Sequence, residues 1–262
     1  MSKLRSAGSQ IWPRIALLAG ILLLWGIVYQ AGIFDRKLFP SPLSVWDAFT
    51  QHLTGAEGLL VAAEKSIIRL AVGMVAAVIL GTAIGLAMAS WKPIQRSVGT
   101  LMVALQALPS IAWLALALLW FGQHSARAIV YVVILGAFPS VAIATASSVR
   151  LVPAVLIRAG RTLGASGWEL QRSIIFPAAL PGYVAGLQQA WAFGWRALLA
   201  GELIATGAHG LGTTLAAAGG QDNTSLILAT MIIIVVVGLV IDFGLTFFDR
   251  RIRQRRGLLA DA

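Results

Sequence analysis

The chain alternates long apolar runs with short polar segments. Each run has about 20 residues or more, which is the length of α-helix that crosses the ~30 Å hydrocarbon core of a bilayer. The pattern therefore predicts an all-α fold, a polytopic membrane bundle of about six transmembrane helices within residues 14–249. The expected spans are residues 15–34, 64–89, 97–122, 126–148, 182–205 and 226–248.

The segments beside these runs have patterns of their own. Residues 1–13 are a short basic tail that we expect to be poorly ordered, and residues 250–262 are a second basic tail. Residues 43–53 have the spacing of a weakly amphipathic helix at the membrane interface, with a plain loop as the alternative. Residues 206–223 are rich in Gly and Ala and are interpreted as an outer loop or a re-entrant turn. The first apolar run is longer than a signal-peptide core, so we interpret it as a retained helix.

Small residues and prolines mark how the spans pack. Lys65 and Arg69, at the outer end of the second span, are expected to snorkel towards water. Pro109 is expected to bend the third span, and Pro139 lies inside the fourth. A ridge of small residues lets another helix approach closely, and we favour packing within the chain over a subunit interface. The ridge consists of Gly73, Ala77, Gly81, Gly85 and Ala89.

Composition excludes a soluble domain and several kinds of site. The chain is 58% hydrophobic and 11% charged, whereas soluble domains average about 25% charged residues. It has no cysteine, so disulfides and thiolate metal sites are excluded. Its three histidines are scattered, and no P-loop motif is present. We therefore predict neither a metal site nor a cofactor on this chain, and no enzymatic activity.

The net charge of +10 is distributed unevenly between the two sides of the predicted bundle. Fourteen of the 20 Lys and Arg residues fall in the two tails, counting Arg14 with the first, in the loop between the second and third spans, and in residues 150–177. The positive-inside rule then places both termini and the 150–177 loop in the cytoplasm. The basic charge is thus explained by topology and lipid headgroups, and no nucleic-acid partner is expected.

Residues 151–180 interrupt the apolar pattern with two short helices. Pro153 can open the first helix, and Gly164 can take the conformation that ends it. Its apolar face comprises Val152, Val155, Leu156, Ala159 and Leu163. Ser166 and Glu169 have the spacing of a capping box that starts the second helix, which Pro177 should stop. Two such helices between spans form a docking element.

This stretch resembles the cytoplasmic "EAA" loop of bacterial ABC-importer permeases. Gly164, Ile174 and Pro177 match its spacing, and the words AGRTLGAS and FPAALPG are similar to the taurine, sulfonate and nitrate group. The words PSIAWL and WFG in the third span, and GELI with GLG at the exit of the fifth span, extend the resemblance. Three positions depart from the pattern: Arg158 stands where the motif has Glu, Gly160 replaces an Ala, and Ala115 stands where a Pro is expected.

The resemblance implies a function and partners. It implies the membrane permease of an ABC importer in the bacterial cell membrane, a homodimer with one path between two copies. ATP and Mg²⁺ would be bound by two copies of a cytoplasmic ATPase subunit, and an extracytoplasmic substrate-binding protein would deliver the substrate. The implied ATPase-docking residues are Arg158, Ala159, Gly160, Leu163, Gly164, Ala165, Ser166, Ile174 and Pro177.

Polar residues within the spans are candidates for the translocation path. A charge at the centre of a span costs at least ~2.5–3.5 kcal/mol, so Arg196 must face protein or water. It either pairs with Glu202 or a neighbouring chain, or meets an anion in transit. The resemblance favours a sulfonate, taurine or nitrate as substrate, with a thiamine precursor or bicarbonate as alternatives. The candidate path residues are Gln106 and Trp113, expected to share one face of the third span with Trp120, and Gln188, Gln189, Trp195, Arg196 and Glu202.

Two other classes of protein fit the sequence less well. A secondary transporter that works alone would show broken helices with carboxylates at mid-membrane depth, but Glu202 and Asp242 both lie towards helix ends. A membrane-embedded enzyme would need a nucleophile–base pair or metal ligands within the spans, and the sequence shows none. The ABC permease is therefore the leading interpretation.

Overall fold

The computed structural model describes residues 2–122, 125–205 and 208–255, and every regular element in them is helical. The first half of the chain contains α1 (Ser2–Gln30), α2 (Pro42–His52), α3 (Leu59–Ser90), α4 (Lys92–Ala107), α5 (Ser110–Phe121) and α6 (Ala126–Arg150). The second half contains α7 (Ala154–Thr162), α8 (Gly167–Leu170), the π-helical turn η1 (Gln171–Ile175), α9 (Phe176–Ile204), α10 (Leu211–Gly220) and α11 (Thr224–Arg255). The all-α prediction is confirmed.

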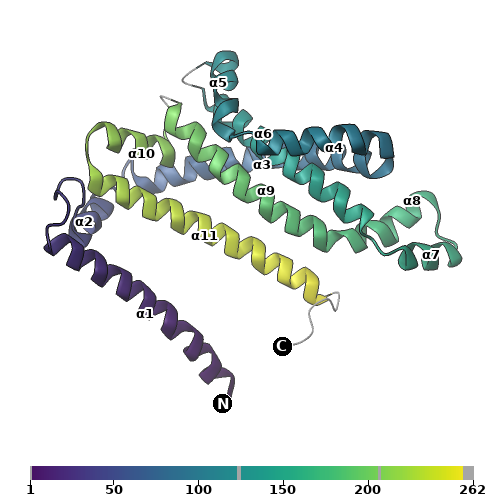
Figure 1. Cartoon of the computed structure of the whole chain (residues 1–262), viewed down its shortest axis with the longest axis horizontal. Coiled ribbons are helices and arrows are strands. Elements are labelled where there is room, and N and C mark those ends of the chain that lie inside the picture. Colours follow the sequence, from purple (N-terminus) through teal and green to yellow (C-terminus); the bar gives the residue numbers. More distant parts are fainter. Residues whose placement is uncertain (1, 123–124, 206–207, 256–262) are drawn as a thin grey trace.

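Helices α3, α6 and α9 form the centre of the bundle and pack along their lengths (Figure 1). The small-residue ridge of α3 faces α6. A Cβ on Gly73 would lie 2.5 Å from Val133 Cγ1, and one on Gly81 would lie 2.6 Å from Val141 Cβ. The helices approach this closely because these positions have no side chain. The ridge therefore packs within the chain, as predicted.

The predicted third span is not one helix. Helices α4 and α5 meet at Leu108 and Pro109 with a bend of 92°. Leu108 is extended, with φ −70° and ψ 130°, because a proline disfavours helical geometry in the residue before it. Gln106 and Trp113 consequently lie on two differently directed helices, and the prediction that they share one face with Trp120 is wrong.

Pro177 does not stop a helix. Helices α8, η1 and α9 follow one another without a gap, and Pro177 lies in the first turn of α9. A proline is tolerated there, and the preceding π-turn changes the local hydrogen-bond pattern. The helical path to Ile204 begins at Gly167, before residue 182 where the fifth span is predicted to start. The bounds of that span in the membrane stay a prediction.

Two segments expected to be irregular are helical. Residues 2–13 belong to α1, since Lys, Leu, Arg and Ala favour helix in this region. Part of the predicted loop 206–223 forms α10, while residues 206–207 lie outside the described residues. In the C-terminal tail, residues up to Arg255 continue α11, and 256–262 are not described. The amphipathic helix expected over residues 43–53 is present as α2, and its place at the membrane interface stays a prediction.

Apolar helices suited to a membrane are present in the described part of the chain. Helices α3, α6 and α11 are each long and apolar enough to cross a bilayer, and α4 with α5 would add a fourth crossing if the bent pair is one span. The described apolar part of α1 is shorter, Ile15–Gln30, and α9 is not in this set. Six crossings remain a prediction that includes these two.

Candidate functional site

The segment between α6 and α9 is a helical hairpin at one end of the molecule, opposite α2 and α10 (Figure 1). Gly164 has φ +92°, a conformation that favours glycine. Its amide donates to the Arg161 carbonyl (3.0 Å), and the amide of Ala165 donates to the Gly160 carbonyl (3.0 Å). These two bonds form a Schellman motif, which ends α7 and reverses the chain. The predicted role of Gly164 in ending the helix is confirmed.

The start of α8 differs from its prediction. Ser166 is the N-cap residue, but its side chain makes no capping hydrogen bond. Gly167, the first residue of α8, has φ +52°, so the turn does not have regular helical geometry. The amide of Glu169 donates to the Ser166 carbonyl (3.1 Å) instead of the hydroxyl. The predicted Ser166–Glu169 capping box is therefore wrong, although the helix begins where it was expected.

A small apolar cluster holds the hairpin together. Val152, Leu170 and Ile175 are buried in it. Gly160 is also buried, and a Cβ there would overlap the side chain of Ile174. Two of the predicted docking residues, Gly160 and Ile174, thus lie against each other inside the hairpin. Pro177 is half-buried where the hairpin joins α9.

The outer surface of the hairpin is both apolar and basic. Leu163 is 87% exposed, Trp168 is 68% exposed and Val155 is 59% exposed. The side chains of Arg158 and Arg161 are also exposed, three residues apart on α7. Isolated exposed apolar residues are ordinary, but several on one short hairpin indicate an interaction surface. The other docking candidates on this surface are Ala159, Gly164 and Ser166, with Ala165 half-buried.

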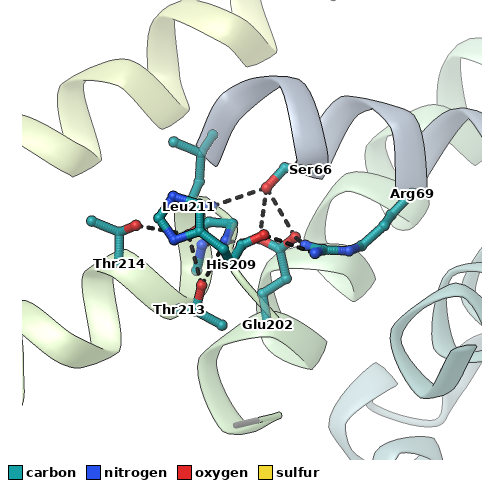
Figure 2. Close-up of polar contacts among 9 residues, drawn as sticks. Ser66, Arg69, Glu202, His209, Leu211, Thr213 and Thr214 are labelled. Carbon is teal, nitrogen blue, oxygen red and sulfur yellow. Dashed lines mark hydrogen bonds and ion pairs between the residues drawn. The ribbon is translucent and has the colours of Figure 1, made fainter. Parts of the chain in front are cut away.

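At the other end of α9, Glu202 is fully buried in a polar cluster (Figure 2). Its carboxylate accepts hydrogen bonds from Arg69 Nη1 (2.7 Å), Ser66 Oγ (2.8 Å to Oε2) and the Gly212 amide (3.0 Å). Arg69 Nη2 also donates to the His209 carbonyl (2.7 Å). The Arg69 guanidinium neutralises the buried negative charge of Glu202, and the Ser66 hydroxyl and the Gly212 amide supply the carboxylate's other hydrogen bonds. The cluster ties α9 to α3, to the start of α10 and to His209 just before it.

One sequence expectation about charges is therefore wrong, and one of the alternatives for Arg196 is excluded. Arg69 does not snorkel to water, because its side chain is only 12% exposed and pairs with Glu202. Arg196 does not pair with Glu202, whose carboxylate is already fully bonded. Glycine makes the true arrangement possible: a Cβ on Gly212 would lie 2.6 Å from Glu202 Cβ, and one on Gly210 would lie 2.7 Å from Arg69 Nη1. The sequence gives no local signal for this pair, because Arg69 and Glu202 are 133 residues apart.

The polar residues of α9 fall into an internal set and an exposed set. Gln188 donates to Thr246 Oγ1 of α11 (3.4 Å), and Trp195 stacks on Trp191 with ring centroids 5.5 Å apart. Gln189 and Arg196 are exposed. The Arg196 guanidinium lies 5.7 Å from the Phe193 ring, and no carboxylate of the described residues lies within ion-pair distance of it. Of the predicted path residues on α9, only this second set is open at the surface of the chain.

The remaining candidates are less distinctive. Gln106 and Trp113 are half-buried on α4 and α5, and Trp113 packs beside Leu114 and Ala117. A cavity of about 750 Å³ lies beside the Glu202 cluster, between α9 and α10, with His209 and Thr213 in its lining. Within residues 2–122, 125–205 and 208–255, no three His, Asp or Glu side chains are grouped as metal ligands.

Comparison with known proteins decides the family. The model of the binding-protein-dependent transport system inner membrane component family matches residues 71–254, which include the hairpin and the whole of α9. The chain belongs to this family. It is an ABC-importer permease, and the resemblance found in the loop at Gly164 is confirmed. Permeases of this family are transport subunits and not enzymes.

Three relatives of the permease illustrate the range of the family. A protein of Methanocaldococcus jannaschii named as an ABC transporter permease is 31% identical over 199 residues, which are 76% of this chain and 74% of that one. The taurine transport system permease protein of Escherichia coli is 29% identical over 253 residues, 95% of this chain and 91% of that one. The bicarbonate transport system permease protein of a Synechocystis strain is 28% identical over 258 residues, with coverage of 95% and 91%.

Solved structures share the fold. The permease matches a chain of the inward-facing MetNI methionine ABC transporter with a TM-score of 0.67 and 20% identity, covering 74% of this chain and 95% of that one. A bacterial ABC transporter involved in the import of alginate matches with a TM-score of 0.63 and 15% identity, covering 95% and 99%. At these identities the likeness supports the architecture alone.

Proposed function

We propose that the permease forms the translocation path for a small anion of the sulfonate, taurine, nitrate or bicarbonate type. An extracytoplasmic binding protein delivers the substrate, and a separate cytoplasmic ATPase subunit, which binds ATP and Mg²⁺, drives transport. The hairpin of α7 and α8 is the surface that the ATPase binds. Both chain termini lie on the cytoplasmic side, as the distribution of Lys and Arg favours.

One observation carries the docking role: a rigid hairpin with an exposed apolar surface continues directly into a long span. Leu163 and Trp168 are presented to a partner, while the Schellman motif and the cluster around Leu170 fix the hairpin's shape. From Gly167 the helical path runs through η1 into α9, whose 29 residues extend about 43 Å at 1.5 Å per residue. A displacement of the hairpin by the ATPase is thereby passed into the bundle.

The exposed polar face of α9 supports both a second copy and an anionic substrate. Gln189 and Arg196 lie seven residues apart, two turns of one helix, and both are open at the surface of the single chain. A lipid-facing arginine at mid-span is unfavourable by at least ~2.5–3.5 kcal/mol. A water-filled path between two copies removes that cost, and a guanidinium in the path attracts an anion. Relatives named for taurine, bicarbonate and nitrate transport fit this substrate class.

The test reconstitutes the whole importer. The permease is co-expressed with the ATPase and the binding protein encoded beside it, purified through a tag on the permease and placed in lipid. ATPase activity is then measured with taurine, an alkanesulfonate, nitrate, bicarbonate and a pyrimidine precursor of thiamine. We expect stimulation by one loaded binding protein carrying an anion. The absence of any co-purifying ATPase would refute the docking role, and stimulation by the pyrimidine alone would refute the anion.

Arg196→Gln tests the path separately. We expect it to lower ATP-driven uptake of the anion into proteoliposomes about tenfold, the order of a lost hydrogen bond to a charged group, while the complex still assembles. Gln188→Leu is the matched control, because Gln188 faces Thr246 inside the chain. Equal uptake by Arg196→Gln and the native permease would exclude Arg196 from the path.

A further inference from the structure

The hairpin carries an excess of positive charge that no ion pair of the described residues neutralises. Residues 150–177 contain four arginines, Arg150, Arg158, Arg161 and Arg172, against one acidic residue, Glu169. In the part of the chain that the structure describes, the ion pairs are Arg69–Glu202 and Arg253–Asp249. The hairpin arginines thus make no ion pair with a carboxylate of the described residues, and their charge is available to a partner.

Two of these arginines form one basic edge. Arg158 and Arg161 are three residues apart on α7, so they lie on the same side of the helix, and both side chains are exposed. Arg161 lies in the last turn, where a cation interacts favourably with the helix dipole. Arg158 lies further from that end, so the helix dipole does not explain why an arginine stands at this position.

The neighbouring apolar side chains favour a protein over a lipid surface as the partner of this edge. Leu163, 87% exposed, directly follows α7, and Trp168, 68% exposed, lies on α8. Trp and Arg are enriched among the hot spots of protein–protein interfaces, and the hairpin exposes both. An anionic membrane surface would attract the arginines equally well but would not require a fixed hairpin.

We propose that the ATPase groove that receives this hairpin is acidic along the side facing Arg158 and Arg161 and apolar beneath Leu163. This proposal rests on the docking role proposed above and adds the charge of the partner. Carboxylates opposite the two guanidiniums steer the ATPase to this permease and disfavour ATPases whose grooves are basic there. The departure of Arg158 from the glutamate of the loop motif then selects the partner by charge.

The test uses the purified ATPase that is encoded beside the permease. Its binding to the permease in zwitterionic lipid nanodiscs is measured over a series of sodium chloride concentrations. We expect Arg158→Glu/Arg161→Glu to raise the Kd about tenfold and to reduce its salt dependence, while Arg158→Lys/Arg161→Lys stays close to native. Arg250→Glu, an exposed arginine on α11, is the matched control and should bind normally. Replacing an acidic groove residue of the ATPase by arginine should restore binding to the glutamate variant.

The outcomes separate this inference from the docking role. If Leu163→Glu abolishes binding while Arg158→Glu/Arg161→Glu binds with native affinity, docking stands and the acidic groove is refuted. If neither variant changes binding, the docking role itself fails. If the double variant keeps its affinity for the ATPase but loses retention on phosphatidylglycerol vesicles, the arginines face lipid and the inference is overturned.

Discussion

The two ends of α9 differ in whether their charged side chains are exposed or buried in an ion pair. At its start, the hairpin exposes Arg158 and Arg161 without a carboxylate partner from the described residues. Near its other end, Glu202 is fully buried and Arg69 nearly so, and they bond to each other. The arginines at one end therefore make no ion pair within the described residues, whereas the Arg69–Glu202 pair at the other end holds three segments of this chain together.

This difference shows which changes should matter for stability and which for assembly. An exposed charge interacts mainly with water until a partner arrives, so its removal changes the fold little. A buried pair is different, because removal of one member leaves the other in a low-dielectric site without compensation. Damage at the Glu202 end should therefore unfold the permease, whereas damage at the hairpin end should chiefly affect association with the ATPase.

The largest expected effect comes from breaking the buried pair. Glu202→Ala should lower the free energy of unfolding by about 3–5 kcal/mol, because Arg69 loses its counter-ion. Thermal unfolding of the detergent-solubilised permease measures the change. Arg196→Ala is the matched control, an exposed charge on the same helix. Similar melting temperatures for Glu202→Ala and the control would contradict a stabilising role of the cluster.

A smaller effect is expected from overfilling the hairpin. Gly160→Leu should lower the free energy of unfolding by about 1–3 kcal/mol, because Ile174 and Leu170 occupy the space that its side chain would need. The hairpin should shift and bind the ATPase more weakly. Adding Ile174→Ala returns volume to the cluster and should recover part of the binding. If Gly160→Leu alone binds the ATPase normally, the packing of α7 on η1 is not required for docking.

Local signals in the sequence were sufficient to predict much of the hairpin's structure. The turn at Gly164 was predicted because glycine favours positive φ and the apolar pattern stops there. The capping box was not formed, since Gly167 takes φ +52° and the hydrogen bonds rearrange. Sequence spacing identifies candidate caps, but a neighbouring glycine can change the geometry that the cap needs.

The buried pair could not be predicted from the same kind of signal. Arg69 and Glu202 are 133 residues apart, and only the packing of α3 against α9 brings them together. Each residue alone fitted another interpretation, Arg69 as a snorkelling side chain and Glu202 as a partner for Arg196. The bend between α4 and α5 was expected at Pro109, but its size of 92° depends on how α5 packs on α6 and α9.

The smallest expected effect tests the hairpin turn itself. Gly164 has φ +92° with no atom near its Cβ position, so a substitution there acts through backbone conformation and not through a clash. Gly164→Val should lower the free energy of unfolding by about 1–2 kcal/mol, which is the range for a left-handed conformation in an L-residue. Gly164→Asn is the matched variant, because asparagine tolerates positive φ better. We expect the ATPase to bind Gly164→Asn more tightly than Gly164→Val in the nanodisc assay. Equal binding by the two variants would mean that the Schellman turn does not set the shape that the ATPase recognises, and the docking surface would then be the exposed face of α7 alone.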